Sequence, residues 1–71
     1  MLSSNTDFTK REKDIIELLK FGYNNSEIAE RLQISRHTIK FYITNLLIKT
    51  QSKNRTHLIY NLAKNDYFKL S

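Results

Sequence analysis

The side chains that are best suited to bind a partner molecule lie close together in the middle of the sequence. Lys40, Phe41 and Thr44 supply a cation, an aromatic ring and a hydroxyl, and Arg36 and His37 precede them by about one turn of a helix. Side chains of these kinds hydrogen-bond to base edges in the major groove of DNA and contact thymine methyl groups. The segment therefore predicts a surface that contacts nucleic-acid bases.

Catalysis and metal binding lack the residues that they would need. The chain has no cysteine and two histidines, so neither a disulfide nor a thiolate zinc site can form. The carboxylates of Glu27 and Glu30 belong to one short predicted helix and have no partner nucleophile. We therefore expect no cofactor, no metal and no enzymatic activity.

The sequence around the base-contacting residues predicts a helix-turn-helix. Residues 24–40 have the pattern of two short helices joined by a tight turn, and the small Ala29 suits a close crossing of the two. The apolar contacts between them would come from Ile28, Leu32, Ile34 and Ile39. In such a motif the second helix lies in the major groove of DNA.

Four helices are expected in all, each with a residue that can cap its first turn. The caps are Thr9, Asn24, Ser35 and Asn54. Thr9 and Glu12 have the spacing of a capping box, and Gly22 is suited to end the first helix. The second helix is expected to end at 32 or 33, and the third at 49 or 50. The sequence thus predicts an all-α, compact four-helix domain over residues 8–71, preceded by a flexible leader over residues 1–7.

The third predicted helix has two distinct faces. With 100° between successive residues, one face gathers Ile39, Ile43, Leu46 and Thr50. The opposite face carries His37, Phe41, Thr44 and Ile48. Phe41 could contact a thymine methyl or a sugar, or it could shield a neighbouring side chain, and the sequence leaves both alternatives open.

The charge distribution agrees with a polyanionic partner. The formal net charge is +5, and between residues 31 and 65 there are seven basic residues and no acidic one. Composition alone does not choose nucleic acid over a membrane surface. However, no apolar run is long enough to span a bilayer, and the first residues lack the pattern of a signal peptide. We expect a cytoplasmic protein without a membrane partner.

At this point the chain resembles the LuxR/GerE-type (NarL/FixJ-type) DNA-binding domain of bacterial transcription regulators. The resemblance rests on residues 8–12, 25–32, 38–40 and 54–56, and it covers the chain from residue 8 to about 63. Thr50 departs from the pattern, since a leucine normally stands there. The resemblance implies a response-regulator output domain that binds double-stranded DNA as a dimer.

The resemblance also implies roles for individual residues. The base-reading residues would be Lys40, Phe41 and Thr44. The phosphate contacts would come from Asn24, Asn25, Ser26, Lys49 and Arg55, with Arg36 also near a phosphate and His37 facing the groove. The fourth helix would form the dimer contact through Leu58, Ile59, Leu62 and Ala63, so Leu62→Glu would impair dimerisation more than folding. Alternatively, Tyr67 and Phe68 could fold back and cover this helix.

Two other functions remain open from the sequence. One is a sigma-factor region that reads a promoter element, and RNA polymerase is in any case a candidate partner. The other is a protein-interaction module that uses its basic face to bind an acidic protein.

Overall fold

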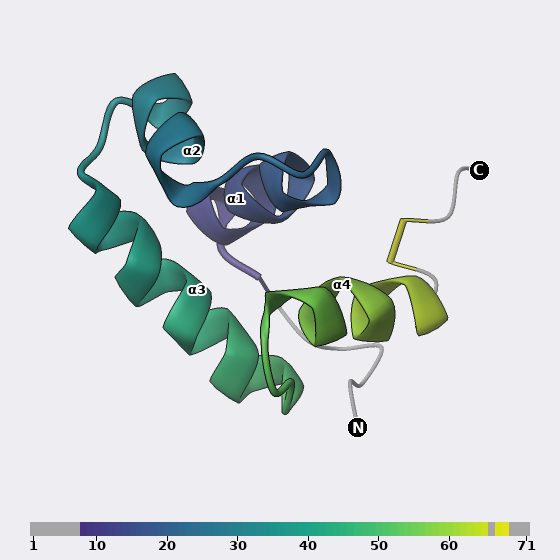
Figure 1. The fold of residues 1–71 in the computed structure, drawn as a ribbon. Helices are drawn as coiled ribbons and strands as arrows, with labels where there is room; N and C mark the ends of the chain where they lie inside the picture. Colours follow the sequence, from purple (N-terminus) through teal and green to yellow (C-terminus); the bar gives the residue numbers. More distant parts are fainter. Residues whose placement is uncertain (1–7, 66, 69–71) are drawn as a thin grey trace.

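Four helices make up the part of the chain that the computed structural model describes, residues 8–65 and 67–68 (Figure 1). They are α1 (Lys10–Lys20), α2 (Asn25–Leu32), α3 (Arg36–Thr50) and α4 (Arg55–Lys64). The predicted all-α class is confirmed, and α2, the turn and α3 form the predicted helix-turn-helix. The leader predicted over residues 1–7 lies outside the described residues.

Each helix begins where a side chain satisfies a backbone N–H of the first turn. The capping oxygens belong to Thr9, Asn24, Ser35 and Asn54, as predicted. In α1 and α2 the carboxylate of the third helical residue also accepts a hydrogen bond from the backbone N–H of the capping residue, which completes a capping box. These bonds are local, so they fix the start of each helix independently of the tertiary packing.

The turns that follow the first three helices use left-handed backbone conformations. Gly22, which follows α1, has a φ of 87°, a value that glycine adopts without steric cost. Gln33 and Gln51 end α2 and α3 with φ values of 57° and 55°. The turn at Gln33 sets the direction in which α3 leaves α2, and so it orients the second helix of the motif.

The hydrophobic core draws on all four helices. Its fully buried members are Ile15, Ile16, Ile28, Ile39, Leu46, Leu58 and Leu62. The inner face of α3 is the predicted one, because Ile39, Ile43, Leu46 and Thr50 are all buried. The outer face of α3 points away from the other three helices, along one side of the molecule (Figure 1).

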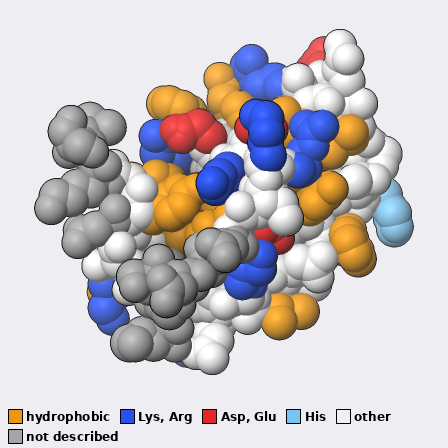
Figure 2. Space-filling view, turned by 180° about the vertical axis from the view of Figure 1, so that it is seen from behind, with side chains coloured by type: hydrophobic (Ala, Val, Ile, Leu, Met, Phe, Trp, Pro, Cys, Tyr) orange, Lys and Arg blue, Asp and Glu red, His pale blue; other side chains and the backbone are white. Residues whose placement is uncertain are grey.

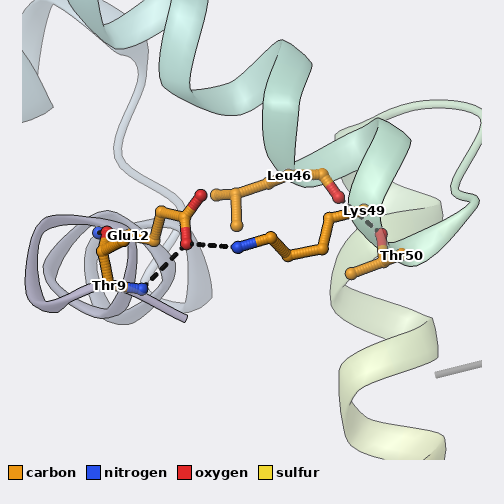
Figure 3. Close-up of polar contacts among 5 residues, drawn as sticks. All are labelled: Thr9, Glu12, Leu46, Lys49 and Thr50. Atoms are coloured by element: carbon orange, nitrogen blue, oxygen red, sulfur yellow. Dashed lines mark hydrogen bonds and ion pairs between the residues drawn. The ribbon is translucent and has the colours of Figure 1, made fainter. Parts of the chain in front are cut away.

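Polar contacts complete the junction between α3 and α4. Thr50 is 4% exposed, and its hydroxyl donates to the Leu46 carbonyl at 2.8 Å (Figure 3). Because that proton is used, the Ser52 hydroxyl donates to Thr50 at 2.6 Å, and the Asn61 amide donates to Ser52 at 2.9 Å. Threonine is therefore accommodated at a buried position by a short chain of hydrogen bonds.

Two of the residues predicted for a dimer contact on α4 belong to the core instead. Leu58 and Leu62 are fully buried within the protomer, so they have no surface to offer a second copy. The prediction that Leu62→Glu would impair dimerisation more than folding is therefore wrong, because the charge would enter the core. Ile59 is half-buried and Ala63 is exposed. The exposed aromatic residue of this helix is Tyr60, at 61%.

The chain after α4 returns to the core. The Tyr67 backbone N–H donates to the Leu62 carbonyl at 2.9 Å, and the Tyr67 ring meets the Phe8 ring edge-on at 5.5 Å. Phe68 packs edge-on against Tyr67 at 5.2 Å. Tyr67 and Phe68 thus fold back against the core, as one of the two alternatives from the sequence expected, whereas Tyr60 on α4 is exposed.

Candidate nucleic-acid interface

An open depression lies where the beginnings of α2, α3 and α4 meet. Its lining consists of Asn24, Asn25, Ser26, Arg36, His37, Lys40 and Arg55. Every one of these residues is among those that the sequence predicts for DNA contact. The fold thus brings together groups from three separate segments on one face, and it gives that face cations and hydrogen-bond donors.

The first turn of α2 contributes polar groups whose orientation is fixed. Asn24 and Glu27 exchange hydrogen bonds of 2.9 Å in the capping box. The Arg36 guanidinium, from the first turn of α3, donates to the Ser26 hydroxyl at 3.2 Å. Because Arg36 is itself exposed, its charge lies at the surface next to the positive end of the α2 dipole.

Arg55 attaches the beginning of α4 to this region. Its guanidinium donates to the Asn25 side-chain oxygen at 2.6 Å and to the Tyr23 carbonyl at 2.9 Å. An arginine carries five N–H donors, more than these two contacts use. Arg55 therefore holds the start of α2 in place and also adds positive charge to the depression.

The outer face of α3 continues the surface beyond the depression. His37 and Lys40 are exposed and line it, whereas Phe41 and Thr44 are exposed on the same face without lining it. Phe41 is 61% exposed, and its ring meets the ring of the neighbouring Tyr42 edge-on, with centroids 6.2 Å apart. The ring thus contacts a neighbouring side chain, as the shielding alternative expects, and still presents most of its surface outward. The result is a row of cation, ring and hydroxyl along the helix.

Lys49 lies apart from the depression and joins two helices. Its ammonium contacts the Glu12 carboxylate at 2.8 Å, which links α3 to α1 (Figure 3). The same carboxylate accepts from the Thr9 backbone N–H at 2.9 Å. Glu12 thus takes part both in the capping box of α1 and in an ion pair with a base of α3. Lys49 therefore holds α3 against α1 and does not line the depression.

The environment of Glu12 lowers its pKa. Burial is the largest single influence and acts to raise the pKa, but hydrogen bonds from Lys49 and Thr9 and the charge of Lys49 together outweigh it. Glu12 is therefore ionised at neutral pH, and its role is to fix the position of α1 against α3.

Elsewhere on the molecule, acidic and basic side chains are interspersed. Seen from behind the view of Figure 1, acidic side chains lie among Lys and Arg, and hydrophobic side chains show in separate patches (Figure 2). On α1, Asp14 lies 3.7 Å from Lys10 and 3.9 Å from Arg11, and Glu17 lies 2.7 Å from Lys20. Because the acidic side chains of α1 lie next to basic ones, whereas the described residues that line the depression include cations and no acidic residue, the face with the depression is the one favoured for contact with a polyanion.

Other kinds of site are not found in the described part of the chain. Over residues 8–65 and 67–68, no group of three or more His, Asp or Glu side chains is placed to hold a metal ion. None of the helices described there is long and apolar enough to cross a membrane.

The fold and this face define the class of helix-turn-helix DNA-binding domains. Residues 6–62 match the model of the family described as bacterial regulatory proteins, luxR family, and the chain belongs to that family. Members of the family are DNA-binding regulators and not enzymes, so the chain is a DNA-binding domain of a family of transcriptional regulators.

Individual relatives agree with this assignment. The chain is 36% identical over 97% of its length to the transcriptional regulatory protein DesR of Bacillus subtilis, of which the match covers 35%. It is 36% identical over 87% of its length to DegU of Brevibacillus brevis, covering 26% of that protein. It is 38% identical over 75% of its length to the response regulator Rre1 of Synechocystis, covering 23%. The chain thus spans about a third or less of the length of these relatives.

Proposed function

We propose that this domain binds double-stranded DNA sequence-specifically, with α3 in the major groove, and that it regulates transcription as the output domain of a longer protein. The observation that carries the proposal is the basic depression beside the exposed face of α3. With 15 residues, α3 is about 22 Å long, and the diameter of a helix fits a major groove about 12 Å wide.

The residues divide into two groups by the chemistry of their partners. Arg36, Arg55 and the first turn of α2, residues 24–26, would bind phosphates, since they combine guanidinium groups with a helix N-terminus. Lys40 and Thr44 would meet base edges, and His37 would lie between the two groups. Phosphate contacts would supply much of the affinity, and contacts with bases would supply the sequence preference.

We further propose that two copies bind together through α4. The support is the exposed Tyr60, with the exposed Ala63 and the half-buried Ile59 on the same helix. A two-fold dimer would present its two α3 helices to half-sites about 34–36 Å apart, one turn of DNA. A cytoplasmic location and a contact with RNA polymerase stay predictions.

The test is selection of random duplex DNA by the domain at two salt concentrations, followed by sequencing. The proposal predicts an enriched palindromic motif that persists at the higher salt concentration. Lys40→Ala, which removes a base-contacting group from an exposed position, should bind with weaker sequence preference. Binding without an enriched motif, lost as salt rises, would refute sequence-specific binding and favour a basic surface that serves an acidic protein partner.

A further inference from the structure

The ring of Phe41 is an exposed apolar group in the middle of the face that we propose for DNA. It is 61% exposed, whereas Ile39 on the opposite face of α3 is fully buried. The ring meets the neighbouring Tyr42 ring edge-on, with centroids 6.2 Å apart and an angle of 70° between the planes. The core of the protomer therefore does not explain a phenylalanine at this position.

The neighbours of Phe41 indicate what it would meet. Lys40 precedes it, and His37 and Thr44 lie one turn away on the same side of the helix. These three can hydrogen-bond to polar atoms of the base edges, but a phenyl ring cannot. The apolar group that the major groove displays is the C5-methyl of thymine, which cytosine lacks.

We propose that Phe41 recognises the C5-methyl group of a pyrimidine, which is thymine in ordinary DNA and 5-methylcytosine in modified DNA. This inference rests on the proposed function, because it requires α3 to lie in the major groove. Contact between the ring and the methyl removes apolar surface of both from water. Unmodified cytosine has no C5-methyl, so at the same position the ring loses this contact, and this disfavours cytosine relative to thymine and 5-methylcytosine.

The experiment replaces the thymines of a selected duplex one at a time by deoxyuridine, which removes the methyl and leaves the base pairing unchanged. Affinity is measured by fluorescence anisotropy for the wild type, Phe41→Ala and Ile48→Ala. Ile48 is a matched control, since it is 71% exposed on the same helix face two turns further along. At one position, uracil should weaken wild-type and Ile48→Ala binding about fourfold, the effect of burying one methyl-sized group, and should leave Phe41→Ala binding unchanged.

A second pair of duplexes carries cytosine or 5-methylcytosine at that position. The added methyl should strengthen binding of the wild type by a similar factor and have no effect on Phe41→Ala. Circular dichroism of each variant shows that the fold is retained. The proposal is overturned if the wild type tolerates every uracil, or if Phe41→Ala remains as sensitive as the wild type.

The experiments distinguish failure of the methyl contact from failure of the proposed function. If Phe41→Ala behaves like the wild type but Lys40→Ala loses sequence preference, the methyl contact is refuted and major-groove binding is supported. If random selection yields no motif at all, both proposals are overturned.

Discussion

Replacing Lys49 by methionine should destabilise the domain more than replacing its partner Glu12 by glutamine. The two side chains differ in exposure, at 33% for Lys49 and 7% for Glu12. Lys49→Met leaves a carboxylate that is shielded from water without its cation. Glu12→Gln leaves an ammonium that can reach water, and the glutamine oxygen can still accept from the Thr9 backbone N–H.

The exposures set the expected magnitudes. A hydrogen bond that involves a charged group contributes about 1.5–3 kcal/mol, so Lys49→Met should lower the free energy of unfolding by about 2 kcal/mol at pH 7. Glu12→Gln should lower it by about 0.5–1 kcal/mol, since the cation can recover its hydration. For a domain of this size, about 2 kcal/mol corresponds to a decrease of roughly 8–16 °C in Tm.

The difference between the variants should depend on pH. Because the pKa of Glu12 is lowered in the folded wild type, its contribution to stability is present at neutral pH and is lost as the pH falls through that pKa. In Lys49→Met the bonds that lower the pKa are partly removed, so the pKa of Glu12 rises. Protonation then removes the charge of the Glu12 carboxylate, which has no cation beside it in this variant. The loss of unfolding free energy caused by Lys49→Met should therefore become smaller between pH 7 and about pH 4.

Thermal and urea unfolding, followed by circular dichroism at both pH values, measures these effects. Lys10→Met is the control, because its side chain is 91% exposed and lies 3.7 Å from Asp14, so its effect should stay within about 0.5 kcal/mol. Two results would refute this description of the ion pair. One is that Lys49→Met destabilises the domain no more than Glu12→Gln at pH 7, and the other is that the loss of unfolding free energy in Lys49→Met does not change with pH.

Three further predictions concern binding and self-association. Lys40→Ala should weaken binding to the selected site by about 1–3 kcal/mol with little effect on unrelated duplexes, and an unchanged footprint would contradict the placement of α3. Arg36→Ala should weaken binding to all sequences alike and make the plot of log K against log salt shallower by about 1; a loss confined to one sequence would exclude a phosphate contact. Tyr60→Ser should leave unfolding within about 0.5 kcal/mol of the wild type and reduce the sedimenting mass at high concentration, whereas Leu62→Glu should cost about 4 kcal/mol or more by placing a charge in the core. An unchanged mass for Tyr60→Ser would remove this residue from the dimer surface.

The helix starts could be predicted from the sequence because capping is local. Ser35 and Asn54 each accept a hydrogen bond from a backbone N–H three residues later, so sequence and structure are linked without reference to tertiary contacts. The faces of α3 could be predicted for the same reason, since helical periodicity separates Ile39 from Phe41. The local pattern also placed the turn at Gly22.

The partners of individual side chains could not be predicted in this way. Glu12 and Lys49 are 37 residues apart, and their contact depends on how α1 crosses α3. The contacts of Arg55 with Asn25 and the Tyr23 carbonyl likewise require the start of α4 to meet the start of α2. On α4, periodicity identifies an apolar arc but not which part of it faces the core, so it does not separate the buried Leu62 from a residue of the surface.

Chemical-shift mapping tests the central claim most directly. The amide spectrum of the isotope-labelled domain is recorded with a selected duplex and with a scrambled duplex of the same composition. The account predicts shifts at residues 24–26 and 36–44 that are larger with the selected duplex, and little change over residues 10–20 of α1. Shifts confined to α1 or α4, or the same shifts with both duplexes, would contradict major-groove reading by α3.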